Sequence, residues 1–368
     1  LLSKILPVFA GKQRPLKIVF LHEMDATSST WTRAHAIGRR SLEANFPEQV
    51  TTSHIDYVLP GVDDEIRIEA AVRGGADVIF TTSAPMMPAC LKVAARHPDV
   101  KFLNCSLNVP HPLVRTYYAR MNEVKYLLGM LAGILTQGNE IGYLAHYPIY
   151  GTPAGINAFA LGVKAVRPSA KVILRWTCVE AHQNSLDFAD KENINIIYGR
   201  DQKDPTLGGD FMKAYNLYQR LADGSAQDLA TPALHWDSIY KEIVRSILDG
   251  TWTNEAADTQ RALNYWWGLQ SGCVAIEYES ILPTASHDLL SIMEAQLMQG
   301  NLQPFSGMLY AQGHTERKAA DGIAFSPEEL IHMDWLLENV EGSIPHTRDL
   351  ISSAHRLVAF QGLPCAKD

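Results

Sequence analysis

Residues 17–23, KIVFLHE, form a short apolar run with the length and aliphatic content of a buried β-strand. Residues 31–46 follow with apolar side chains at helical spacing, and strand-like and helix-like segments continue to alternate as far as residue 120. This alternation is typical of parallel strands joined by right-handed crossovers. We therefore expect a Rossmann-like open sheet with strands at 17–23, 51–58, 77–82, 101–107 and 116–120, separated by helices at 31–46, 64–74 and 88–97.

The alternation restarts after a long helix predicted over residues 121–135. Two consecutive units of this kind predict an α/β fold of two Rossmann-like lobes with parallel sheets, whose strands end at a common cleft. The C-terminal third is expected to cross back between the lobes and complete a multi-strand hinge that closes on a ligand. The second unit comprises strands at 140–146, 171–178, 194–200, 214–217 and 230–236, then a helix at 238–249, a strand at 271–277, and helices at 284–300 and 327–340, the last capped by Ser326.

The expected lobes are not continuous in sequence. Residues 17–118 with about 252–290 are predicted to form lobe 1, and residues 119–251 with about 291–345 lobe 2, which leaves 346–368 as a C-terminal extension. Residues 1–16 have the character of a linker or an arbitrary N-terminus. The chain opens with LLSKILPVF, without an initiator Met, a signal peptide or a lipobox cysteine, so it is interpreted as a fragment of a longer polypeptide.

The composition is that of a globular protein and excludes several classes. Of 368 residues, 32 are Lys or Arg and 40 are Asp or Glu, a formal charge of −8 without a basic cluster, so no nucleic-acid partner is expected. Five cysteines without a CxxC pair predict reduced thiols rather than disulfides or a zinc site. The longest apolar helix candidate, residues 124–135, includes Lys125 and is too short to span a bilayer.

Catalytic signatures are missing from the sequence. It contains no GxSxG, GxxxxGK(S/T) or HExxH motif, and no GxGxxG follows the first strand. The 13 histidines include no i, i+4 pair on a plausible metal-binding helix. The sequence therefore favours a binding protein without cofactor or metal over an enzyme.

The turn after the first predicted strand lies where open sheets bind their ligands. In this turn, HEMDATSSTWTRAHAIG (22–38), Trp31 begins the helix and offers a flat face to a heteroaromatic ring, with stacking worth roughly 0.5–1.5 kcal/mol. Packing in the core of the lobe is the alternative role for Trp31. Asp25 either accepts a hydrogen bond from a ligand hydroxyl or amine, or acts as a turn residue.

Other strand ends carry polar and aromatic residues that are expected near the same cleft. Each of these residues could instead cap the end of a strand or pack in the core. Their clustering at strand ends is more informative than any single residue. The remaining candidates are Ser83 and Ser106 in the first lobe, His146, Tyr147, Trp176 and Asp201 at the strand ends of the second, and Trp236, Asp237 and Trp267 farther along the chain.

A set of short segments resembles the basic membrane protein family of ABC-transporter substrate-binding proteins, which includes purine nucleoside receptors. The resemblance covers roughly residues 16–345, and the segments occur in the family's order. It implies a type I periplasmic-binding-protein fold and a purine nucleoside or nucleobase as ligand for an ABC importer. The segments are 123–129 (EVKYLLG), 141–143 (IGY), 155–162 (GINAFALG), 247–252 (ILDGTW), 301–307 (NLQPFSG), 333–335 (MDW) and 340–345 (VEGSIP).

The resemblance also implies roles for individual residues. The family's Phe-Asn pair at the first helix, with Phe stacking on the base, falls on Trp31-Thr32, so the stacking role is kept. The family's ribose-binding aspartate falls on Ser106, which argues against a tightly held ribose. The adenine-type branch carries a Trp near Trp236 and a YWGG-like segment matched by residues 265–268. These features favour a free purine base over a nucleoside.

Two other functions remain open. A cytoplasmic purine-sensing regulatory domain would be fused to an N-terminal domain, whereas a transport receptor would be lipid-anchored at the bacterial cell envelope and meet an ABC permease. A nucleoside-processing enzyme would use the carboxylates Asp25, Asp201 and Asp237, but no activated nucleophile accompanies them.

Overall fold

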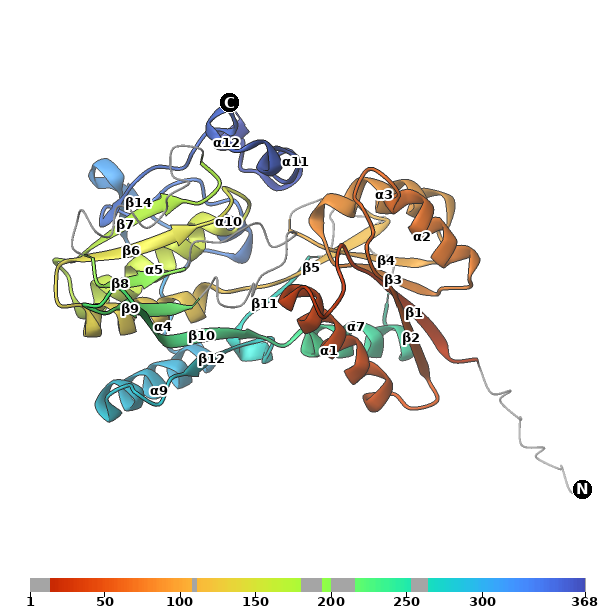
Figure 1. Cartoon of the computed structure of the whole chain (residues 1–368), viewed down its shortest axis with the longest axis horizontal. Coiled ribbons are helices and arrows are strands. Elements are labelled where there is room, and N and C mark those ends of the chain that lie inside the picture. Colours follow the sequence, from red (N-terminus) through yellow and green to blue (C-terminus); the bar gives the residue numbers. More distant parts are fainter. Residues whose placement is uncertain (1–13, 108–110, 180–193, 200–215, 253–263, 368) are drawn as a thin grey trace, which may run out of the picture.

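The computed structural model describes residues 14–107, 111–179, 194–199, 216–252 and 264–367. These residues form two α/β lobes, each with its own sheet, and the C-terminal helices lie near the gap between them (Figure 1). Within these ranges, every helix is too short or too polar to cross a membrane.

The first lobe contains a six-stranded parallel sheet in the order β11-β5-β4-β3-β1-β2. The expected strands and helices of residues 17–120 are present within a few residues of their predicted ends. The strands are β1 (Leu16–Leu21), β2 (Val50–Ile55), β3 (Val78–Thr81), β4 (Lys101–Cys105), β5 (Val114–Ala119) and β11 (Asn264–Trp267). The helices are α1 (Thr30–Asn45), α2 (Asp64–Arg73), α3 (Met87–Arg96) and α7 (Trp236–Leu248), with a short turn η1 (Ala84–Met86) before α3.

The central strand β1 is buried on both faces, as a doubly wound parallel sheet requires. Alternate side chains of a strand point to opposite faces. Ile18 and Phe20 pack in the core cluster that includes residues of α1 and α7. Val19 and Leu21 pack in a second cluster with residues of α2 and α3. The continuous apolar run is thus explained by two helical layers.

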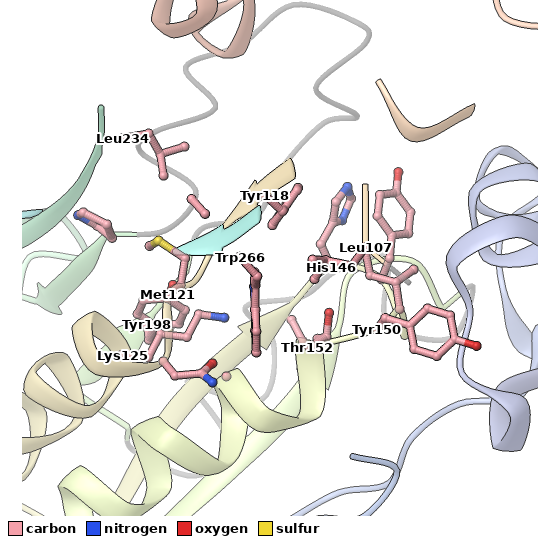
Figure 2. A pocket seen from close by; sticks show the side chains of 18 of the residues that line it. Leu107, Tyr118, Met121, Lys125, His146, Tyr150, Thr152, Tyr198, Leu234 and Trp266 are labelled. Atoms are coloured by element: carbon pink, nitrogen blue, oxygen red, sulfur yellow. The ribbon is translucent and has the colours of Figure 1, made fainter. Parts of the chain in front are cut away.

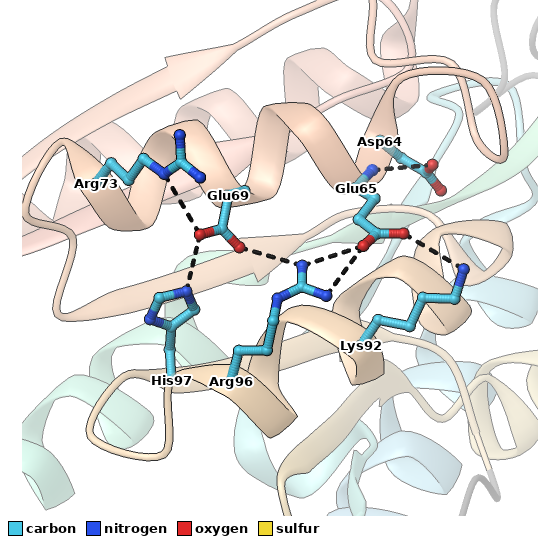
Figure 3. A network of polar contacts seen from close by, with 7 residues as sticks. All are labelled: Asp64, Glu65, Glu69, Arg73, Lys92, Arg96 and His97. Carbon is cyan, nitrogen blue, oxygen red and sulfur yellow. Dashed lines mark hydrogen bonds and ion pairs between the residues drawn. The ribbon is translucent and has the colours of Figure 1, made fainter.

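Helices α2 and α3 are joined at the surface by a network of ion pairs (Figure 3). Glu65 accepts from Lys92 at 3.3 Å and from Arg96 at 3.0 Å. Glu69 accepts from Arg96 at 3.1 Å and lies 2.9 Å from Nε2 of His97. Because these pairs are solvent-exposed in part, each contributes roughly 0–1 kcal/mol, and the buried faces of the helices dominate their stability.

The second lobe contains a seven-stranded sheet in the order β12-β10-β9-β8-β6-β7-β15. It is mixed, because strands β9, β10 and β12 run antiparallel to their neighbours. The strand expected at 214–217 begins at Leu217 instead and forms a hairpin with the next one, whose turn is made by Asp223 and by Gly224 at positive φ. The strands are β6 (Glu140–Ala145), β7 (Lys171–Trp176), β8 (Ile196–Tyr198), β9 (Leu217–Arg220), β10 (Ala226–Leu234), β12 (Val274–Tyr278) and β15 (Val340–Glu341).

The helices α4 (Asn122–Leu135) and α5 (Thr152–Val166) of this lobe pack side by side and parallel. Gly155 near the start of α5 faces Lys125 near the start of α4, and Gly129 faces Phe159 one turn farther along both helices. A Cβ atom on Gly129 would lie 2.0 Å from the carbonyl oxygen of Phe159, so only glycine permits this approach. The N-termini of both helices therefore lie at the same end of the pair.

Three chain crossings connect the lobes, between β5 and α4, between β10 and α7, and between β11 and β12. Helix α7 follows a strand of the second sheet but packs against α1 of the first lobe. We therefore propose that lobe 1 consists of the described residues within 14–119 and 236–267, and lobe 2 of the described residues within 122–234 and 274–351. Helix α7 then counts with lobe 1, although the expected range 119–251 had included it in lobe 2.

The C-terminal part differs from the expectation of one helix over 327–340. Ser326 caps α10 (Pro327–Ile331) with a complete capping box, but this helix ends after five residues. Asn157 of α5 donates to the carbonyl of Trp335 and accepts from the amide of Leu337, both at 2.9 Å, which holds the following segment extended. The remaining elements are α9 (Thr284–Met298), the hairpin β13 (Leu309–Ala311) and β14 (Thr315–Arg317), α11 (Ser352–Gln361) and α12 (Pro364–Lys367).

Candidate ligand-binding site

Two cavities with a common wall lie in the cleft between the lobes. The inner cavity, of about 130 Å³, borders the chain crossings at Asn122, Trp236 and Trp266. The outer cavity, of about 430 Å³, borders the strand ends of lobe 1 and helix α11. Trp31 and Tyr118 line both, and the outer volume falls in the range of about 300–1,000 Å³ typical of small-molecule sites.

Trp31 stands where the two cavities meet. Its helix α1 begins at the carboxyl end of β1, and Ser29 caps the helix by accepting from the amide of Thr32 at 3.2 Å. The indole Nε1 donates to the carbonyl of Thr82 at 2.9 Å, which fixes the ring. Trp236 meets Trp31 edge to face, with ring centroids 5.3 Å apart. Trp31 is therefore oriented by its neighbours and only half buried.

The strand ends of lobe 1 bring small polar groups to the outer cavity. Asn104 of β4 donates to Thr81 Oγ1 at 2.7 Å and to the carbonyl of Ser83 at 2.9 Å, while its Oδ1 has no hydrogen-bond partner. Ser106 is buried, lines the cavity and has no partner for its Oγ. Ser83 also lines the cavity, and its hydroxyl donates to Glu23. The unpaired Ser106 hydroxyl leaves a hydrogen bond for a ligand to complete, whereas Asn104 lines neither cavity and holds the strand ends together.

Four of the candidate residues lie away from both cavities. Asp25 accepts from the hydroxyls of Thr27 and Tyr57 and from the amides of residues 27 and 28 at 2.7 and 2.8 Å. Its pKa is lowered by these hydrogen bonds, first by that of the Thr27 side chain and then by that of Tyr57. Trp176 is in the core of lobe 2 and donates to the carbonyl of residue 343 at 2.8 Å. Asp237 pairs within α7, 2.9 Å from the ammonium of residue 241. Trp267 faces away from the cavities, and Asp201 lies outside the described residues.

Several lining residues were not singled out from the sequence. Trp266 lines the inner cavity, where Trp267 was expected. The side chain of Lys125 points into the same cavity next to Trp266 (Figure 2). Lys125 is 9% exposed, and burial lowers the pKa of its ammonium to about 8. The sequence could have indicated Lys125 as a candidate, because it is the one charged residue in the apolar run 124–135 and lysine is rarely buried without a partner.

Residues that follow β6 in the second lobe line both cavities. His146 and Tyr147, expected at this edge, line both cavities. The Nδ1 atom of His146 lies 2.6 Å from the hydroxyl of Thr177 at the end of β7, which orients the ring. Tyr150, two residues before α5, adds a further aromatic side chain to both cavities.

Helix α11 closes the outer cavity from the side of the C-terminus. The side-chain Oε1 of Gln361 accepts from the amide of Leu107 in lobe 1 at 3.0 Å. Its main-chain carbonyl accepts from the amide of Tyr150 in lobe 2 at 2.9 Å. Arg356 of the same helix donates to the carbonyl of Pro60 in lobe 1. The predicted C-terminal extension thus takes part in the cleft.

The described ranges contain no cluster of three or more His, Cys, Asp or Glu side chains suited to a metal ion. The family model for PnrA-like ABC transporter substrate-binding proteins, Bmp, matches residues 16–199, half of the chain. The chain belongs to the Bmp family. Because this family consists of substrate-binding proteins, the Bmp chain is the substrate-binding component of an ABC transporter, and the expectation of binding without catalysis is confirmed.

Individual relatives of the Bmp chain differ in their named ligands. A purine-binding protein of Brucella abortus is 26% identical over 344 residues, 91% of this chain and 96% of the relative. An ABC transporter glucose-binding protein of Haloferax volcanii, so named, is 26% identical over 330 residues, 86% of this chain and 78% of the relative. A solved ABC transporter solute-binding protein of Conexibacter woesei has a TM-score of 0.53 at 16% identity, covering 78% of this chain and 98% of its own. The expected periplasmic-binding-protein fold is therefore confirmed.

Proposed function

We propose that this Bmp-family chain binds a purine nucleobase in the cleft between its lobes and presents it to an ABC transporter. The observation that carries the proposal is the half-buried Trp31, held by its hydrogen bond to Thr82 at the meeting point of the two cavities. A ring fixed in this way offers a preformed surface to a flat heteroaromatic ligand. The purine-binding relative from Brucella abortus supports the same ligand class.

Aromatic walls on several sides suit a planar ligand. Tyr118 lies next to Trp31 with ring centroids 6.2 Å apart, and Trp266 and Tyr150 add rings from the crossing and from lobe 2. Offset or edge contacts between such rings and a base contribute roughly 0.5–1.5 kcal/mol each beyond burial of area. The fully buried Trp236 packs edge to face against Trp31, and its Nε1 has no hydrogen-bond partner among the described residues.

The polar groups favour a base over a nucleoside or a sugar. Hydroxyl pairs of a ribose or a hexose are well bound by carboxylates, which accept two hydrogen bonds at once. Within the described part of the chain no Asp or Glu lines the inner cavity, and in the outer one Glu23 already accepts from Ser83. Ser106, which the resemblance to the family aligns with its ribose-binding aspartate, offers one hydroxyl to a ring nitrogen or oxygen.

Isothermal titration calorimetry of the purified chain with purine bases, their nucleosides and glucose tests the proposal. We expect at least one base to bind, and Trp31→Ala to weaken its binding by about 1–3 kcal/mol. Trp267→Ala is the matched control, since it removes the same side chain from a position that lines neither cavity. Binding of glucose but of no purine, or equal effects of the two variants, would contradict the proposal.

A further inference from the structure

Lys125 is a buried cation at the inner cavity. Among the residues that the structure describes, no carboxylate forms an ion pair with its ammonium, whose nearest aromatic partners are the rings of Tyr143 and Tyr198, each with its centroid 5.7 Å from Nζ. Its side chain occupies the space left by Gly155, where a Cβ atom would lie 2.6 Å from Nζ. The chain thus keeps room for an ammonium group at the inner cavity.

Two helix N-termini face the same cavity. The parallel packing of α4 and α5 brings their first turns together, and Asn122 and Thr152, the first residues of these helices, both line the inner cavity. Each N-terminus carries a partial positive charge from its aligned peptide dipoles. The potential of both helices therefore adds to that of the Lys125 ammonium, and all three favour negative charge in the cavity.

Two buried donors of the described residues lie unpaired at this end of the cleft. Asn122 Nδ2 and Trp236 Nε1 are buried and have no partner, and both residues line the inner cavity with Lys125. Among the residues that the structure describes, no Asp or Glu side chain lines this cavity. A ligand edge made of donors, such as the amino group and ring C–H of adenine, leaves the ammonium and these groups unsatisfied, which is strongly unfavourable.

From this arrangement we infer that Lys125 is a specificity-determining residue, which binds a carbonyl or anionic ring oxygen of the ligand and so selects oxopurines over adenine. The inference rests on the proposed function, that a purine base occupies the cleft. Xanthine and urate are suitable probes because they carry several ring oxygens and lose a ring proton more readily than adenine. The ligand oxygen would accept a hydrogen bond from the Lys125 ammonium, which lines the cavity with the donors of Asn122 and Trp236.

The test is calorimetric titration of the full chain with xanthine, urate and adenine, for the wild type and for Lys125→Met and Lys125→Arg. We expect the wild type to bind xanthine or urate at least about tenfold more tightly than adenine. Lys125→Met should weaken the oxopurine by about tenfold to hundredfold and leave adenine nearly unchanged. Lys125→Arg keeps the charge and should retain the preference.

Thermal unfolding without ligand separates this role from a structural one. Removing an unpaired buried charge should raise the Tm of Lys125→Met, whereas loss of a structural contact would lower it. Tighter or equal binding of adenine by the wild type, or an unaltered preference in Lys125→Met, overturns the inference and leaves the proposed function standing. Failure of every purine to bind overturns the proposed function and the inference with it.

Discussion

His22, at the end of β1, makes the stability of lobe 1 sensitive to acid. Its ring is buried, and Nδ1 lies 2.9 Å from the hydroxyl of Thr82. Because that hydroxyl donates to the carbonyl of Leu21, Nδ1 carries the proton and Nε2 is left without a partner. Burial, with smaller contributions from His54 and Arg39, lowers the pKa of His22 to about 3. Protonation would therefore bury a second N–H without a hydrogen-bond partner.

The sign and size of the effect follow from the pKa values. The folded-state pKa of His22 lies below the unfolded value of about 6.5, so the unfolded chain binds more protons and stability is lost as pH falls from about 6.5 toward about 3. Each unit of pH in this window is worth about 1.4 kcal/mol, which gives about 2 kcal/mol between pH 7 and pH 5. His35, also fully buried with a lowered pKa, adds to the loss.

Urea unfolding of the wild type, His22→Leu and His332→Gln at pH 7 and pH 5 measures this contribution. We expect the loss of unfolding free energy between these two pH values to be about 2 kcal/mol smaller in His22→Leu than in the wild type. His332 is exposed, so His332→Gln should behave as the wild type does. Equal losses in His22→Leu and the wild type would refute the reasoning.

Three further changes have distinct expected results. Gly129→Ala places a Cβ 2.0 Å from the carbonyl oxygen of Phe159, so calorimetric unfolding should show a loss of about 1–3 kcal/mol or more, and an unchanged Tm would contradict the packing. Gln361→Ala removes the side-chain link to Leu107, so small-angle scattering of the free protein should indicate a more open molecule. Asp25→Ala should leave ligand affinity within about twofold of the wild type in calorimetric titration, since this carboxylate lines neither cavity and accepts from residues 27 and 28 and from the Tyr57 hydroxyl.

The first lobe could be predicted well because its pattern is local. Each strand of residues 17–120 is a short apolar run, and each helix shows its own spacing of apolar residues. The second lobe was harder because the direction of a strand depends on its partners. β9 is antiparallel to β8, a pairing that no periodicity reveals. The early end of α10 depends on hydrogen bonds from Asn157, which is more than 170 residues away.

Residues that line the cavities could be predicted where their position at the end of a strand or the start of a helix decides which way the side chain points. Trp31, Ser83 and Ser106 line the cavities because they follow parallel strands at one edge of the sheet. The choice between Trp266 and Trp267 depends on the register of β11 against β5, where a shift of one residue exchanges the two faces. No pattern in the sequence indicates that register.

Gln361 forms hydrogen bonds with residues of both lobes. Its main chain holds Tyr150 of lobe 2, and its side chain holds Leu107 of lobe 1. Any hinge rotation that separates Leu107 from Tyr150 must break one of these two hydrogen bonds. The lifetime of a ligand in the outer cavity should therefore depend on how often one of these two hydrogen bonds opens.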